Sequence, residues 1–372
     1  QPVEPRWPFA EVTGVEDGDE IDSLMLRPDD SRERLAALIT SPRNRRFPRV
    51  MVNHLWNRLI GAAIVEPVHD WEGRDPSHPE LLRWLSTQFM VSHYDAKHVL
   101  RLIMNSDLYQ REPVGRNAEA GPPLRFFAAP DRRRLSAEQI VDSLFVSCGA
   151  QMDTEELTFV HDGVHPMNKR LTLGKPSRAW MLASLNNERD RPSLSLPRAR
   201  PIADVLQAFG WTGSRQKPIP QRDMSPNVLQ PGILANGTLT MSLTRAARGS
   251  ELTELAIAAN SPDALIDSLF LRFLSRYPTP QEKSDLVAPL RTGFEDRLVR
   301  VDPDRQESEL EPLPQVTWTN HLVPEANEVQ LELQRRVLAG PTVDPRLDSP
   351  WREVYEDVIW SLVNHREFVW IP

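Results

Sequence analysis

Side chains that could perform acid–base or metal chemistry gather between His69 and His78. This segment holds two imidazoles, His69 and His78, with the carboxylate of Asp70 and the guanidinium of Arg74 between them. Imidazole and carboxylate groups bind zinc and transfer protons in catalysis. These four residues are therefore the candidate catalytic groups of a hydrolase. The alternative, which we favour, is that Asp70 and His78 cap helix ends and hold the loop by hydrogen bonds.

A second pair of imidazoles, His161 and His165, is spaced four residues apart. On a helix this spacing places two metal ligands on one face. Gly163 and Pro166 argue against a helix here, so the spacing loses its geometric meaning. We therefore assign no metal ion and no cofactor to the chain.

Two further imidazoles and the single cysteine are expected to be structural. His54 and His98 each lie on an amphipathic helix, where a lone histidine is more often partly buried and satisfied by its neighbours. Cys148 ends an apolar helical stretch, and no histidine or cation lies near it in sequence to activate a thiol. We expect Cys148 to be buried as a small apolar residue.

Arginines gather in one Pro-rich stretch, at Arg189, Arg191, Arg198 and Arg200. Paired guanidinium groups could bind a carboxylate or a sulfate. The interpretation that we favour is that they tie this long loop to an acidic protein body. The sequence contains no Gly-rich phosphate loop, no Gly-x-Ser-x-Gly elbow and no His-Glu-x-x-His motif.

Composition limits the classes of protein to which the chain can belong. It is 40% hydrophobic and 26% charged, which is typical of a chain that buries a core. A net charge of −8 argues against general binding to nucleic acid or to anionic membranes, and no apolar run approaches membrane-spanning length. With one cysteine, the chain has no intrachain disulfide and no Cys-x-x-Cys-His haem attachment. It begins at Gln1 without a signal-peptide layout, so we interpret it as a mature product or a piece of a longer protein.

The elements that must position these residues are helices separated by proline. The 34 prolines cluster at the start and in residues 112–130, 192–231 and 302–350, which predicts loops there. Apolar residues at spacings of three and four predict a mainly α, irregular multi-helix domain with long Pro-rich loops and few or no short strands. The expected helices cover residues 31–39, 47–60, 78–89, 97–109, 135–148, 236–248, 251–259, 262–275, 280–292, 329–338 and 352–366. The segments 157–160 and 170–173 are the candidate strands. Ser77 is expected to cap the third helix, with Glu80 completing a capping box.

These patterns divide the chain into six segments. Residues 1–29 form an N-terminal extension or linker, 30–150 a helical N-terminal half, and 151–235 an irregular loop-rich segment. Residues 236–294 form a helical C-terminal half, 295–350 a Pro-rich insertion, and 351–372 a C-terminal helix.

Several motifs resemble those of the planctomycete PSD-one family, a domain of unknown function. The most specific is the string Pro-Ser-His-Pro-Glu-Leu-Leu at residues 76–82. The segment from Phe47 to Trp56 resembles the Asn-Arg-x-Trp helix of the family, with His54 where arginine is usual. Similar matches occur at residues 101–109, 133–142, 269–282 and 358–368. The segments around 200–225 and 295–350 depart from the family pattern.

The resemblance implies a place in the cell, and it does not imply a reaction. Such domains are C-terminal modules of large exported proteins that often carry a cytochrome c-like module, which implies the periplasm or cell envelope. We therefore expect a non-catalytic interaction or scaffold module of an envelope assembly. Its expected partners are other protein subunits, and a c-type cytochrome to which it is an accessory is one candidate. Trp211 and Trp318 are the expected exposed contacts for a partner. The alternative is an envelope hydrolase of polysaccharide, in which the 69–78 loop meets residues 186–200.

Overall fold

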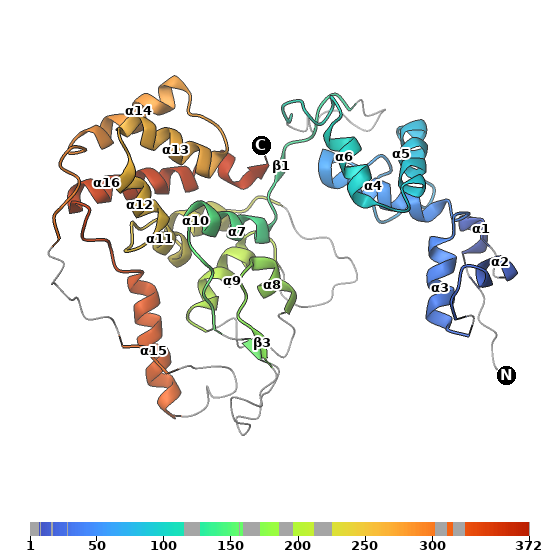
Figure 1. Cartoon of the computed structure of the whole chain (residues 1–372), viewed down its shortest axis with the longest axis horizontal. Coiled ribbons are helices and arrows are strands. Elements are labelled where there is room, and N and C mark those ends of the chain that lie inside the picture. The colour runs from blue at the N-terminus through green and yellow to red at the C-terminus, as the bar shows by residue number, and fades with distance from the viewer. Residues whose placement is uncertain are drawn as a thin grey trace. The chain divides into compact units, whose positions relative to one another are not determined.

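The structure is a computed structural model of the 372-residue chain, and its described elements are almost all helices, which confirms the mainly α fold. It describes residues 7, 9–15, 18–27, 29–114, 127–155, 157–158, 172–185, 196–211, 225–301, 311–314 and 324–371. The chain divides into two compact units, residues 1–133 and 134–371 (Figure 1). The six-segment division drawn from the sequence stays a prediction. No helix in the described part is both long and apolar enough to cross a bilayer.

Unit 1 is built on three packed helices, α4 to α6. Its helices are α1 (Ala10–Thr13), α2 (Asp19–Asp22), α3 (Ser31–Thr40), α4 (Arg46–Ile60), α5 (Pro79–Val91) and α6 (Ala96–Met104). Val52, Trp56 and Ile60 face Leu82 and Phe89 across α4 and α5 in one buried cluster. Because these residues recur at spacings of three and four, each helix buries one apolar stripe.

Two ends of these helices follow from local chemistry. Gly61 ends α4 with φ +88°, and a Cβ at this position would lie 2.8 Å from the Cβ of Asp131. Only glycine fits this left-handed position without strain. The helix that was expected to reach residue 109 ends at Met104, because Ser106 bonds its hydroxyl to the Ile103 carbonyl at 2.6 Å and the chain turns there.

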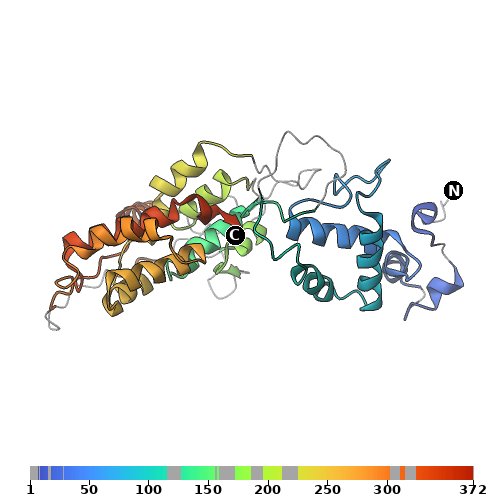
Figure 2. The ribbon, with the colours of Figure 1, turned by 90° about the horizontal axis from the view of Figure 1, so that it is seen from above.

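Unit 2 contains the larger core. Its helices are α7 (Ala137–Ser147), α8 (Ala179–Leu185), α9 (Ala199–Ala208), α10 (Leu229–Asn236), α11 (Thr238–Leu243), α12 (Glu251–Ala258), α13 (Pro262–Leu274), α14 (Pro280–Arg291), α15 (Pro324–Ala339), α16 (Ser349–Val363) and the short 3-10 helix η3 (Arg366–Val369). Figures 1 and 2 show α13, α14 and α16 side by side. Their buried faces meet around Phe270 and Tyr355, and the Tyr355 hydroxyl donates to the Leu252 carbonyl at 2.9 Å.

Strands are few and short in the described residues. β1 (Arg133–Arg134) spans the boundary between the two units along the chain, and β4 (Trp370–Ile371) is the last element of unit 2. β2 (Leu157–Thr158) and β3 (Thr172–Gly174) pair antiparallel with a register shift. The two candidate strands of the sequence are therefore confirmed where the structure describes them.

Helices α8, α9 and α10 were not predicted from the sequence, and α9 is the longest of the three. The stretch from Arg198 to Pro201 was expected to be a loop, but the helix begins at Ala199. Proline is tolerated in the first turn, because the N–H groups there have no partner within the helix. Ile202 and Leu206 then bury one face of α9 in the core of unit 2.

A buried carboxylate explains why α9 begins at that point. Glu155 accepts hydrogen bonds from the backbone N–H groups of Arg198 at 2.8 Å and of Ala199 at 3.0 Å. Burial raises the pKa of the Glu155 carboxyl, and the two N–H donors act against that rise. Arg198 also pairs with Asp153 at 2.7 Å, and both residues belong to the 151–235 segment, so the expectation that the arginines tie this stretch to an acidic body stays a prediction. Arg200 pairs instead with Asp204 on the same helix.

The fold shows that the expected exposure of Trp211 was wrong. Trp211 was expected to be exposed, but only 4% of it is accessible, since it follows α9 directly and packs into the same core. The other expected contact, Trp318, and the arginines Arg189 and Arg191 lie outside the described residues.

We expect Glu155→Ala to lower the free energy of unfolding by about 1–2 kcal/mol, because two N–H groups at the start of α9 lose their acceptor. Glu155→Gln keeps one carbonyl oxygen and removes a charge that burial disfavours, so its loss should be smaller. Urea unfolding followed by circular dichroism measures both changes. Equal losses in the two variants would argue against capping by Glu155.

Candidate functional site

The 61–78 segment of unit 1 is held to α4 by the amide of Asn53. Asn53 is fully buried, and its Nδ2 donates to the Val65 carbonyl at 3.0 Å. Its Oδ1 accepts from the backbone N–H groups of Ile64 at 2.9 Å and of Val65 at 3.0 Å. One side chain thus satisfies three backbone groups that water cannot reach.

The C-terminal end of this segment, at Ser77, is also bonded to Ile64. The Ile64 carbonyl accepts from the backbone N–H of Ser77 at 2.8 Å and from its hydroxyl at 3.0 Å. The predicted capping box is therefore wrong, because the Ser77 hydroxyl is directed to Ile64. α5 begins with Pro79, which has no N–H to satisfy, after an N-cap residue, His78, that makes no capping bond from its side chain.

The four candidate catalytic residues lie on this loop without bonding to one another. Asp70 accepts from the backbone N–H of Glu72 at 3.1 Å, which closes its own turn. His69 and Arg74 are exposed, and His78 shares a hydrogen bond with Ser77 at 3.1 Å. No hydrogen bond or ion pair joins any two of the four, and their catalytic assignment stays a prediction.

The other candidates are held in ways that are typical of structural residues. The His54 ring lies 5.3 Å from the His69 ring, and burial, followed by the charge of His69, lowers the pKa of His54. His98 Nε2 lies 3.3 Å from the Gln88 side-chain oxygen. In unit 2, Cys148 is buried and burial raises the pKa of its thiol to about 12, so almost no thiolate forms at neutral pH.

Metal ligands do not cluster in the described part of the chain. No group of three or more His, Cys, Asp or Glu residues there could hold a metal ion. His161 and His165, the pair spaced four residues apart, lie outside the described residues, as do residues 186–195.

An apolar pocket of about 450 Å³ opens beside this loop within unit 1. Its wall comes from α4, α5, α6 and the turn after α6, and it includes Trp56, Trp84, Leu102, Leu108 and Phe127. Among the described residues that line it, the remaining side chains are aliphatic except for His78 and Ser106. We call this cavity the Trp84 pocket. Its volume is within the range of small-ligand sites, about 300–1,000 Å³.

Ring packing gives the pocket its shape. The Phe127 ring meets Trp56 edge-on at 5.1 Å and lies 5.0 Å from the ring of His78. The Trp56 indole nitrogen is buried and has no hydrogen-bond partner in the described part of unit 1, which costs about 1–3 kcal/mol. At the rim, Trp84 leaves 49% of its surface exposed. Sequence reasoning missed the pocket because its wall is assembled from segments that are up to 71 residues apart, and the apolar spacing of each helix predicted only a core.

These features define a helical domain with an apolar pocket and a polar loop that is bonded within itself. The chain belongs to the family PSD1, protein of unknown function (DUF1553), whose sequence model matches residues 31–290. The resemblance seen in the sequence is thereby confirmed. No curated protein matches the chain. No solved structure matches it either.

We expect Asn53→Ala to lower the free energy of unfolding by about 2–4 kcal/mol, because three buried backbone groups lose their partner. Asn57→Ala is the matched control on the same helix, since the Asn57 side chain is partly exposed and bonds to no residue that the structure describes. It should cost at most about 0.5 kcal/mol. Chemical unfolding compares the two variants. Similar losses at both positions would contradict a special role for Asn53.

Acid should destabilise the protein through His54. Its pKa is lowered in the folded state, so below about pH 6.5 the unfolded chain binds the proton more readily, and stability falls as pH falls. Melting temperatures measured between pH 7.5 and 5.5 should decline, and His54→Gln should make that decline shallower. An unchanged slope in the variant would show that His54 is not the group responsible.

Proposed function

We propose that this chain is a non-catalytic interaction module, and that a partner protein inserts an apolar side chain into the Trp84 pocket. The observation that carries this proposal is the contrast between the pocket and the loop beside it. The pocket is open and almost entirely apolar, whereas Asp70 and Ser77 of the loop use their side-chain oxygens in bonds within unit 1. Such a site can bind, but it offers few groups that could carry out a reaction.

Trp84, at the rim of the pocket, is the residue that favours docking of a protein partner. Trp84 exposes about half of its surface at the edge of a concave apolar wall. Tryptophan is enriched among the few residues that carry most of the binding energy of protein interfaces. Covering it with an apolar side chain would remove apolar area from water at about 25 cal/mol per Å².

The setting that we propose is an envelope assembly in the periplasm or at the cell surface, as the family resemblance implies. Other protein subunits are the proposed partners, and a c-type cytochrome is one of them. Because the chain contains no Cys-x-x-Cys-His motif, any haem would be attached to the partner and not to this chain.

The alternative is an envelope hydrolase of polysaccharide with its site at the 69–78 loop. Glycoside hydrolysis usually needs two carboxyl groups on either side of one bond. Asp70 is used by the turn that it closes, so the loop geometry gives this alternative less support than the pocket gives to docking.

The test is native purification of the tagged protein in three forms: wild type, Trp84→Ala and Trp180→Ala. Trp180 is the matched control, since it is a tryptophan of unit 2 with 58% of its surface exposed. We expect Trp84→Ala to reduce recovery of the wild-type partners by at least about tenfold in quantitative mass spectrometry, which corresponds to about 1.4 kcal/mol. Trp180→Ala should retain them.

Two results would contradict the proposal. One is recovery of the wild-type protein only as an isolated monomer. The other is an equal set of partners for wild type and Trp84→Ala when both variants have the circular dichroism spectrum of the wild type.

A further inference from the structure

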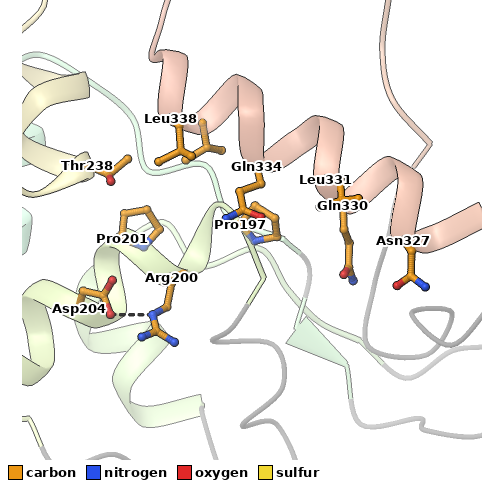
Figure 3. A pocket seen from close by; sticks show the side chains of 11 residues that line it. Pro197, Arg200, Pro201, Asp204, Thr238, Asn327, Gln330, Leu331, Gln334 and Leu338 are labelled. Atoms are coloured by element: carbon orange, nitrogen blue, oxygen red, sulfur yellow. Dashed lines mark hydrogen bonds and ion pairs between the residues drawn. The ribbon is translucent and has the colours of Figure 1, made fainter.

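A second cavity lies within unit 2, between α15 and the start of α9. Its volume is about 370 Å³. Figure 3 shows the side chains that line it. One wall is α15, which contributes Asn327, Gln330 and Gln334, and the opposite wall contains Pro197 and Pro201. We call this cavity the α9–α15 cleft. α15 lies beyond residues 31–290, so the cleft is partly made from sequence outside the family match.

Three side-chain amides line the same face of α15. Asn327, Gln330 and Gln334 follow one another at spacings of three and four residues, which places them on one helix face. Figure 3 shows the amides of Asn327 and Gln330 extending from α15 toward the cleft. Asn327 and Gln334 are exposed and Gln330 is partly exposed, and none of the three side chains is bonded to another described residue. We call them the amide ladder.

An amide side chain carries the same groups as a peptide bond, a carbonyl acceptor and N–H donors. It can therefore donate to the carbonyl of a bound backbone and accept from its N–H. A row of such groups suits a ligand with regularly repeated peptide bonds. Around the ladder, Leu331, Leu338 and the two proline rings supply apolar contact surface.

The charges of the cleft are already balanced. Arg200 Nε donates to Asp204 at 2.7 Å, and Figure 3 shows this pair on the α9 side. Because the two opposite charges lie side by side, the pair carries no net charge that would select an acidic or a basic ligand. The cleft is thus suited to an uncharged segment.

We propose that the α9–α15 cleft binds an extended, uncharged peptide segment of a partner protein. From Asn327 to Leu338, α15 rises by about 16 Å, which is the length of about five residues of extended chain. A saccharide is disfavoured, because sugar rings are usually bound by stacking on aromatic side chains and the described lining contains none. The proposal does not depend on the Trp84 pocket, whose lining belongs entirely to unit 1.

The test is selection of a phage-displayed random heptapeptide library on the full chain, followed by fluorescence polarisation with the enriched peptides. We expect enrichment of uncharged peptides, and binding weakened at least about tenfold by the double variant Gln330→Ala with Gln334→Ala. Arg335→Ala is the matched control on α15, since Arg335 is exposed and lies outside the lining of the cleft. Arg335→Ala should leave binding unchanged.

Several results would overturn the proposal. These are the absence of enrichment, enrichment of charged peptides, or affinity that the double variant does not alter. Binding of the chain to an oligosaccharide array that is lost in the double variant would assign the cleft to glycans instead. Because both substituted amides are at the surface, a folded double variant is expected, and its circular dichroism spectrum checks this.

Discussion

The organisation of unit 1 depends on one buried amide. Asn53 cannot contact water, so its hydrogen bonds to Ile64 and Val65 must form inside the protein. Those bonds fix the chain that leaves α4, and Ile64 in turn receives both donors of Ser77. The start of α5 is therefore placed relative to α4 by a short series of hydrogen bonds. Apolar packing alone would tolerate small shifts between the helices, whereas paired buried groups do not.

Unit 1 has two chemically different surfaces near these hydrogen bonds, a polar loop and an apolar pocket. The polar residues of the 69–78 loop project from a segment whose ends are fixed, and Asp70 is bonded within its own turn. The Trp84 pocket opens beside this loop, where α5 and α6 present Trp84 and Leu102 and where His78 contributes to the lining. Fixed walls are an advantage for a binding module, because less conformational entropy is lost when a partner docks.

The sequence predicted α3, α4, α5, α7, α12, α13, α14 and α16 well, since apolar spacing, Pro79 and the Ser136 cap are local signals. It missed α1 and α2, and the helix expected at 236–248 is α11, which ends at Leu243. It failed where a distant residue decides the local structure. Ser77 has the spacing of a capping box, yet Ile64, 13 residues away, takes its hydroxyl. Glu155, 43 residues before Arg198, caps α9, and nothing near Pro201 in the sequence reveals this.

The candidate sites show the same division. Residue type identified the polar loop, because ionisable groups are visible in a sequence whether or not they act together. The Trp84 pocket and the α9–α15 cleft depend on which apolar and amide side chains remain uncovered after folding, and that depends on the packing of separate helices. Trp211 illustrates the point: it was a candidate surface residue by type, but α9 carries it into the core, whereas Trp84 on α5 stays at a rim. The binding proposals for this chain therefore rest on incompletely covered surface and not on the density of ionisable residues.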